Sequence, residues 1–144
     1  MNYNGGTKVL GILGWPVGHS LSPAMQNAAL KAAKLNFLYV PLPVAPENLK
    51  AAVTGLRAMN FRGFHVTIPH KTAIMSLLDE VDDGAQAIGA VNTVVNDNGR
   101  FIGYNTDADG FMQALLKTNF SPKGKTAVVL GAVYFMDLEV VSYA

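Results

Sequence analysis

The stretch GFHVTIPHK, residues 63–71, decides the fold of this chain. Its apolar and β-branched start favours a buried strand over 63–68, and Pro69 ends that strand. In an open α/β sheet the carboxyl ends of the strands face the ligand crevice. We therefore expect Thr67 and Lys71 to lie where a small polar molecule binds.

Strands and helices alternate on both sides of this stretch. The Asn98-Gly99 dipeptide predicts a tight hairpin, so one strand of the sheet runs antiparallel. The alternation predicts the α/β class, as a three-layer αβα sandwich with a mostly parallel sheet and one antiparallel strand. Besides 63–68, strands are predicted over 8–13, 36–40, 90–95, 101–104 and 126–130, and helices over 23–34, 46–59, 71–78, 82–88 and 107–116.

Composition narrows the class of protein. The chain has 144 residues, of which 50% are hydrophobic, enough for one compact domain. It has no cysteine, which excludes a disulfide scaffold and fits a reducing cytoplasm. A net charge of +1 without a basic run argues against nucleic acid as a partner, and no apolar run approaches the ~18 residues of a membrane span. A cytoplasmic protein with a small-molecule ligand is the expectation.

Polar side chains gather at four predicted strand exits. Hydroxyls, carboxamides, an ammonium and a carboxylate are the groups that a polyhydroxylated acid needs in a binding site. The three histidines lack the spacing of metal ligands, so no metal site is predicted, and His70 is expected on the surface. The polar residues are Ser20 and Ser22, Thr67 and Lys71, Asn92 and Thr93, and Asn105, Thr106 and Asp107.

Each of these residues also has a structural interpretation. Ser22 is a natural N-cap for a helix that continues with Pro23, and Asp107 is typical of a helix start. Asn105 and Thr106 are able to stabilise a turn through local side-chain hydrogen bonds. Lys71 fits a structural role less well, because a cation in the first turn of a helix opposes the helix dipole.

Four blocks carry a family resemblance: GWPVGHSLSPAMQN at 14–27, HVTIPHK at 65–71, GAVNT at 89–93 and GYNTDADGF at 103–111. In this order they resemble the amino-terminal, substrate-binding domain of the shikimate dehydrogenases, over about residues 8–132. The resemblance implies an oxidoreductase that uses NADPH to reduce 3-dehydroshikimate to shikimate, in aromatic amino acid biosynthesis. It implies NADP as the cofactor and leaves the oligomeric state open.

The resemblance also implies roles for individual residues. Lys71 and Asp107 correspond to the family's catalytic pair, and reduction of a ketone by hydride needs such an acid near the oxygen. Asp83 falls where the family can place an acidic residue near the cofactor, although a helix-start aspartate is the simpler interpretation. The implied substrate-binding residues are Ser20, Ser22, Thr67, Lys71, Asn92 and Asp107.

His65 departs from the family pattern. The family usually has asparagine at this position, and histidine is bulkier but still donates or accepts a hydrogen bond. The preference for shikimate or quinate therefore stays open, as does NADP or NAD. The alternatives are a quinate/shikimate dehydrogenase fragment, a non-catalytic shikimate-binding module, and a remnant without function.

The last residues suggest an incomplete second domain. Residues 125–132, KTAVVLGA, resemble the first strand of a dinucleotide-binding domain, but Val133 and Tyr134 follow where a second glycine is expected. We therefore assign 1–122 to the substrate-binding domain and 123–144 to the start of a cofactor domain with an aberrant tail. In the family, substrate lies between the two domains, and a carboxy-terminal helix returns to the first. We expect no turnover from this chain alone, and self-association through 126–130 and 133–141.

Overall fold

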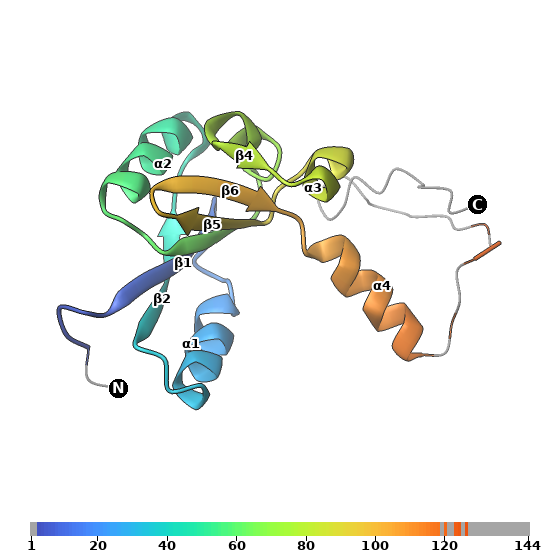
Figure 1. Cartoon of the computed structure of the whole chain (residues 1–144), viewed down its shortest axis with the longest axis horizontal. Helices are drawn as coiled ribbons and strands as arrows, with labels where there is room; N and C mark the ends of the chain where they lie inside the picture. Colours follow the sequence, from blue (N-terminus) through green and yellow to red (C-terminus); the bar gives the residue numbers. More distant parts are fainter. Residues whose placement is uncertain (1–2, 119, 121–122, 125, 127–144) are drawn as a thin grey trace.

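A six-stranded sheet forms the centre of the structure, a computed structural model that describes residues 3–118, 120, 123–124 and 126 (Figure 1). The strand order is β2-β1-β3-β5-β6-β4. The strands are β1 (Lys8–Gly14), β2 (Phe37–Pro43), β3 (Gly63–Val66), β4 (Glu80–Val81), β5 (Thr93–Asp97) and β6 (Arg100–Tyr104). The helices are α1 (Ser22–Ala32), α2 (Leu49–Ala58), α3 (Asp83–Ile88) and α4 (Asp107–Lys117), with 3-10 turns η1 (Pro46–Asn48) and η2 (Ala73–Leu77).

The sheet is mostly parallel. Strand β1 pairs in parallel with β2 and β3, and β4 pairs in parallel with β6. Only β5 among the described strands runs the other way, antiparallel to β3 and β6. Asn98 and Gly99 close the β5–β6 hairpin with φ of 53° and 92°, the left-handed conformation that such two-residue turns require. The predicted fold class and the single antiparallel strand are confirmed.

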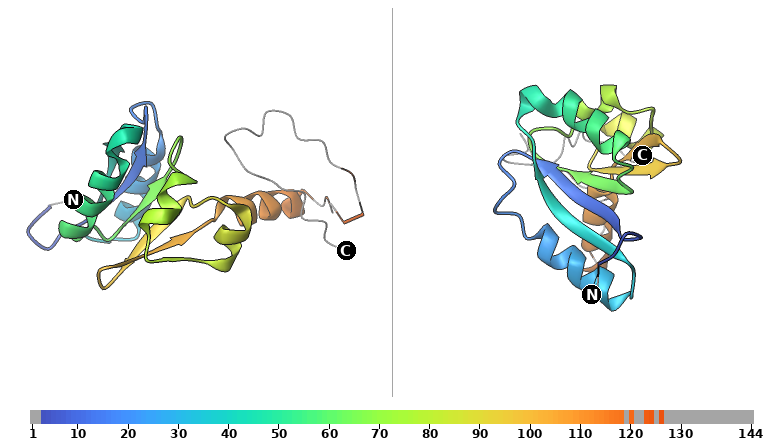
Figure 2. Two further views of the ribbon diagram at one scale, coloured as in Figure 1. Left: turned by 90° about the horizontal axis from the view of Figure 1, so that it is seen from above. Right: turned by 90° about the vertical axis from the view of Figure 1, so that its left-hand side faces the viewer.

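Helices cover the two faces of the sheet unequally. On one face, α2, η2 and α3 enclose the larger core, which includes Leu13, Phe64, Ile74 and Phe101. On the other face, α1 packs over β1 and β2, where Ile12, Val17 and Tyr39 are buried. Figure 2 shows α1 and α2 on opposite sides of the sheet. Helix α4 leaves β6 and points away from the sheet, with no fully buried residue.

Several predicted elements have different bounds. The helix predicted over 71–78 is a shorter 3-10 turn that begins after Lys71, because the Lys71 carbonyl accepts a hydrogen bond from the Val91 N–H (2.8 Å) instead of starting a helix. The strand predicted over 90–95 begins at Thr93, and the two-residue β4 was not predicted. The predicted strand over 126–130 and the segment 133–144 lie outside the described residues.

No helix in the described ranges is long and apolar enough to cross a membrane.

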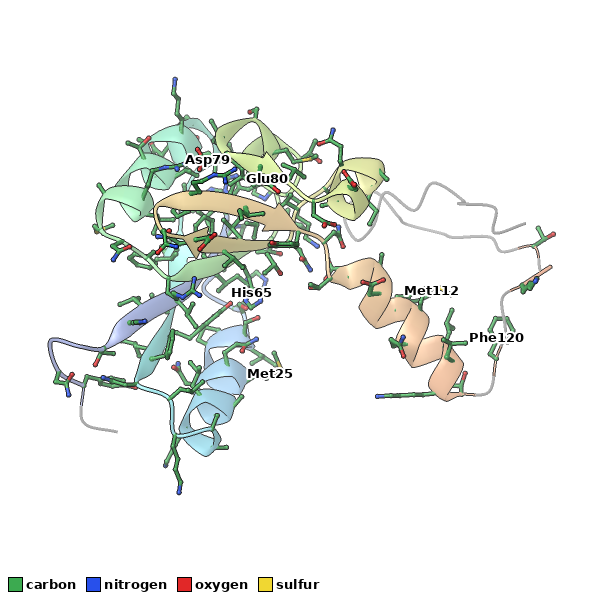
Figure 3. All side chains as sticks on the ribbon, in the orientation of Figure 1. Met25, His65, Asp79, Glu80, Met112 and Phe120 are labelled. Carbon is green, nitrogen blue, oxygen red and sulfur yellow. The ribbon has the colours of Figure 1, made fainter. Side chains whose placement is uncertain are left out.

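Arg57 joins α2 to the β5–β6 hairpin. Its guanidinium donates to the Asp79 carboxylate and to the Gly99 carbonyl (2.8 Å), and it lies 4.5 Å from the Phe101 ring centroid. The hydrogen bond from Arg57, with a second from the Phe101 N–H, holds the pKa of Asp79 below its usual value. Figure 3 shows Asp79 beside Glu80, next to the hairpin.

The Arg57–Asp79 contact makes stability depend on pH. Because the folded-state pKa of Asp79 is depressed, its contribution is present above the unfolded value of 3.8 and is lost as the pH falls through the folded pKa. We expect Asp79→Asn to lower the free energy of unfolding by roughly 1 kcal/mol at neutral pH, since the pair is partly exposed. Urea unfolding of the wild type and of Asp79→Asn, at several pH values from neutral to about pH 3, measures this difference in the free energy of unfolding.

The difference between wild type and Asp79→Asn should shrink toward acid pH. Glu47→Gln is the matched control, because Glu47 is exposed in η1 and should change stability little at any pH. A difference that is independent of pH would contradict the ion-pair explanation.

Candidate functional site

The exits of β1 and β3 are bound to each other at the carboxyl edge of the sheet. The Trp15 N–H donates to the Ile68 carbonyl, and the Thr67 N–H donates to the Leu13 carbonyl, both at 2.9 Å. Gly14 permits this approach, because a Cβ at that position would lie 2.5 Å from Thr67 Cγ2. The loop that starts at Trp15 and the loop that carries Thr67 are therefore fixed together.

His70 also stabilises the carboxyl edge of the sheet through its hydrogen bonds. The prediction that it lies on the surface is wrong, because His70 is only 1% exposed and its Nε2 bonds the Val44 carbonyl at 2.7 Å. Since β3 ends at Val66 and the chain turns back with a hydrogen bond from His70 N–H to Thr67 O, the side chain points inward. The exit of β2 is thus tied to the loop that carries Lys71.

Lys71 and Asp107 form an ion pair at this edge. Lys71 Nζ lies 2.6 Å from Asp107 Oδ2, although the two residues are 36 positions apart. Their side chains are 21% and 38% exposed, so the pair is accessible to a ligand. Asp107 is the first residue of α4, and Asn105 Oδ1 accepts a hydrogen bond from its N–H (3.0 Å). An ammonium held by a carboxylate beside an open edge is suited to donate a proton to a ligand oxygen.

Asn92 connects the start of β5 to the start of α4. It is 7% exposed, and its Oδ1 accepts hydrogen bonds from the Thr106 N–H (3.0 Å), the Thr106 hydroxyl (3.2 Å) and the Thr93 hydroxyl (2.9 Å). Its Nδ2 donates back to Thr106 Oγ1 (3.0 Å). Asn92 thus fixes Thr106, the residue before Asp107. The sequence did not predict this contact, because residues 92 and 106 belong to different local segments.

The two serines lie at the start of α1. The N-cap position is Leu21, not Ser22, and Ser20 Oγ accepts the Ser22 N–H at 3.2 Å. The N-cap prediction was therefore one residue late, and Pro23 is the second helical residue. Among the described residues, no side-chain hydrogen bond joins either serine to Lys71 or Asp107.

Asp83 lies in the first turn of α3, after the N-cap Asp82, whose carboxylate accepts the Gly84 N–H. Asp83 is exposed. This position agrees with a helix-start aspartate, and its cofactor role stays a prediction.

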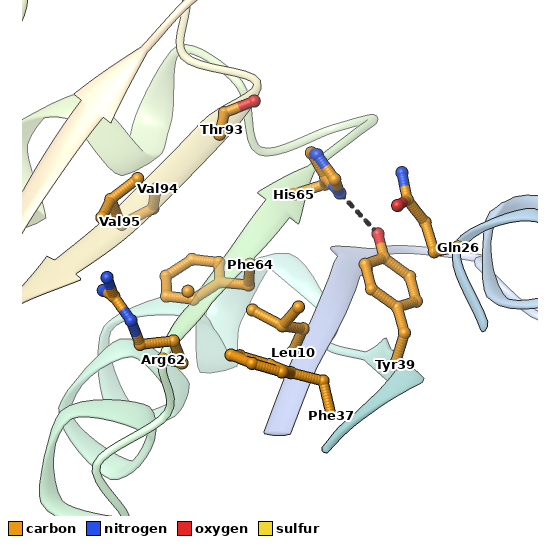
Figure 4. Close-up of a pocket in the computed structure, with 11 residues that line it drawn as sticks. Leu10, Gln26, Phe37, Tyr39, Arg62, Phe64, His65, Thr93, Val94 and Val95 are labelled. Atoms are coloured by element: carbon orange, nitrogen blue, oxygen red, sulfur yellow. Dashed lines mark hydrogen bonds between the residues drawn. The ribbon is translucent and has the colours of Figure 1, made fainter. Parts of the chain in front are cut away.

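His65 lies beside a hollow of about 320 Å³ on the sheet face that α1 partly covers (Figure 4). The hollow has apolar walls, such as Leu10 and Phe37, and His65 and Gln26 are among its polar residues. His65 Nδ1 bonds the Tyr39 hydroxyl at 2.7 Å, so the predicted hydrogen-bonding capacity of His65 is used. Burial lowers the pKa of His65, and the negative charge of Asp107 partly offsets that effect.

Residues 12–94 match the family model described as the shikimate dehydrogenase substrate binding domain. The chain belongs to this family. The matched residues run from β1 through η2 and α3 into β5, and so include the exits that carry the serines, Thr67 and Lys71, and also Asn92, which lies at the start of β5 and not at a strand exit as predicted. The resemblance stated from the four sequence blocks is confirmed.

Relatives of this shikimate dehydrogenase domain are longer. The chain is 53% identical over 130 residues to the shikimate dehydrogenase (NADP(+)) of Desulforamulus reducens, covering 90% of this chain and 45% of the relative. The chain thus spans a little under half the length of that protein.

Two solved structures show the same fold. Shikimate 5-dehydrogenase from Listeria monocytogenes, in complex with shikimate and NAD, is 41% identical with a TM-score of 0.82, over 86% of this chain and 43% of that one. The 5-ketofructose reductase of a Gluconobacter species is 40% identical with a TM-score of 0.79, over 88% of this chain and 45% of that one.

Proposed function

We propose that this domain binds shikimate and 3-dehydroshikimate as the substrate-binding half of an NADP-dependent shikimate dehydrogenase of the cytoplasm. The observation that carries the proposal is the Lys71–Asp107 pair, which the fold assembles from distant segments at an open strand edge. The Desulforamulus relative bears the name of this NADP-dependent enzyme, and the Listeria neighbour is described as binding shikimate. The cysteine-free composition fits the reducing compartment.

In this proposal Lys71 acts on the oxygen of the substrate ketone. Reduction places negative charge on that oxygen, and a positioned ammonium stabilises the charge and donates the proton. Asp107 orients the ammonium through the 2.6 Å contact and accepts a hydrogen bond from a substrate hydroxyl. NADPH, when bound, supplies the hydride.

Other groups at the edge are assigned to substrate recognition. The start of α1 offers backbone N–H groups and the positive end of the helix dipole, which suit a carboxylate, and Ser20 and Ser22 add hydroxyl donors. Thr67 and Asn92 are proposed to contact ring hydroxyls.

Asp83 is the proposed contact to the cofactor. Its exposed carboxylate suits a ribose hydroxyl or an amide, and it would repel phosphate. No step of the proton transfer depends on it.

Quinate is the second candidate substrate, and His65 is the observation that favours it. His65 adds a ring near the Asp107 charge where the family usually has an amide, so the space and the hydrogen bonding at that point change. A domain that binds such acids without catalysis is the remaining alternative.

The activity is tested in an extended protein, in which the corresponding part of the Desulforamulus relative replaces this chain from Val133 onward. We expect the extended protein to oxidise NADPH in the presence of 3-dehydroshikimate and to reverse the reaction with shikimate faster than with quinate. A faster reaction with quinate would identify quinate, and not shikimate, as the preferred substrate. Calorimetric binding of shikimate without turnover would favour the binding module, and neither binding nor turnover would overturn the proposal.

A further inference from the structure

Tyr39 and His65 form a pair on the sheet face that α1 partly covers. The Tyr39 hydroxyl and His65 Nδ1 are 2.7 Å apart, and the ring centroids are 5.7 Å apart with the planes tilted by 44°. Tyr39 is 3% exposed, so its ring lies in the core of that face. Figure 4 shows the hydroxyl directed at the histidine.

Asn27 holds Tyr39 in place from α1. Asn27 Nδ2 donates to the Tyr39 carbonyl (2.8 Å), and Asn27 Oδ1 accepts the Tyr39 N–H (2.9 Å). The side chain thus binds the backbone of the edge strand β2 on both sides of one residue. With its backbone fixed and its ring buried, Tyr39 is a rigid partner for His65.

Tyr39 is the donor of the Tyr39–His65 hydrogen bond, because its hydroxyl keeps its proton and that proton needs an acceptor. Burial raises the pKa of Tyr39, so the hydroxyl keeps its proton. Within the described residues, His65 Nδ1 is the hydrogen-bond partner of that hydroxyl. A proton on Nδ1 would remove that acceptor from the phenol. Tyr39 therefore donates to Nδ1, and neutral His65 carries its proton on Nε2.

His65 stands at the margin of the proposed substrate site. It is directly opposite Thr93 in the β3–β5 ladder, and the Thr93 hydroxyl bonds Asn92 at 2.9 Å. Thr67 follows two residues later, on the side of the chain toward the strand exit. The charge of Asp107 also acts on the His65 ring. The His65 ring, whose Nε2 makes no hydrogen bond among the described residues, thus lies near the groups assigned to the substrate.

We propose that Tyr39 is a positioning residue that holds His65 in its Nε2-protonated form, so that the site presents an N–H donor to an oxygen of a polyhydroxylated acid. The identity of the acid rests on the proposed function. The protonation form does not, because it follows from the contacts of Tyr39 alone. Tyr39 itself does not touch the substrate.

The protonation form is measured without ligand. Two-bond ¹⁵N–¹H spectra of the ¹⁵N-labelled chain separate the two neutral forms of each histidine, and His65→Asn assigns the His65 signals. We expect Nε2–H in the wild type and a mixture of both forms in Tyr39→Phe, with the signals of His70 unchanged. Nδ1–H at His65 in the wild type, or no change in Tyr39→Phe, would overturn the proposal. The wild-type spectrum alone shows which nitrogen of His65 carries the proton, even if the variant fails to fold.

Shikimate affinity, measured by calorimetry, tests the consequence for binding. Introduced into the otherwise wild-type chain, Tyr39→Phe should weaken shikimate binding roughly three- to tenfold, which corresponds to about one hydrogen bond. Introduced into the His65→Asn variant, the same change should have no effect on binding. An equal loss in both backgrounds would show a general structural effect and would refute the positioning role. Absence of shikimate binding by the wild type would refute the proposed function and leave the result on the protonation form standing.

Discussion

Lys71→Ala in the extended enzyme is expected to lower kcat for 3-dehydroshikimate by about two orders of magnitude or more, while KM changes much less. The reason is that a general acid contributes mainly in the transition state, typically about 10²–10⁴-fold. Steady-state rates of NADPH oxidation measure both constants. Lys71→Arg keeps the charge but holds its proton too tightly to donate it, so it should restore binding and not turnover.

Lys50→Ala is the matched control for Lys71→Ala. Lys50 is an exposed lysine of α2 that forms no ion pair among the described residues, and its removal should leave kcat unchanged. A Lys71→Ala enzyme with normal kcat would remove Lys71 from the mechanism.

Phe101→Ala is expected to have the largest effect on stability, lowering the free energy of unfolding by about 3–5 kcal/mol. Phe101 is 0% exposed in the larger core, where its ring meets Phe64 edge-on at 5.4 Å and Arg57 at 4.5 Å. The truncation removes these contacts and leaves a cavity under α2. Urea unfolding followed by circular dichroism measures the change.

Phe111→Ala is the control for that measurement. Phe111 is 45% exposed on α4, so its removal should cost far less. Comparable losses for the two variants would contradict the assignment of Phe101 to the core.

The sequence predicts those features that depend on local pattern. Apolar runs and the Asn98-Gly99 turn identify the main strands and the antiparallel member, because the period of the side chains and the turn chemistry are local properties. Lys71 and Asp107 could be paired through the family resemblance, and their contact is confirmed. Their catalytic roles stay predictions.

Features that depend on tertiary contacts could not be predicted in this way. The inward turn of His70 depends on the Val44 carbonyl, which comes from another strand exit. The hydrogen bonds of Asn92 depend on the position of Thr106, the N-cap of α4, fourteen residues later. No full helix forms after Lys71, because the Val91 N–H donates to the Lys71 carbonyl, which would otherwise accept a hydrogen bond within the helix.

We propose that the strand exits around Lys71 and Asp107 form a shikimate site. Titration of the ¹⁵N-labelled chain with shikimate, followed by amide spectra, tests this proposal. We expect saturable shifts at Ser22, Thr67, Lys71, Asn92 and Asp107, and their loss in Lys71→Ala. Shifts confined to the far end of the sheet around Arg62 and Val95, or no saturable shift at all, would show that shikimate does not bind at this edge.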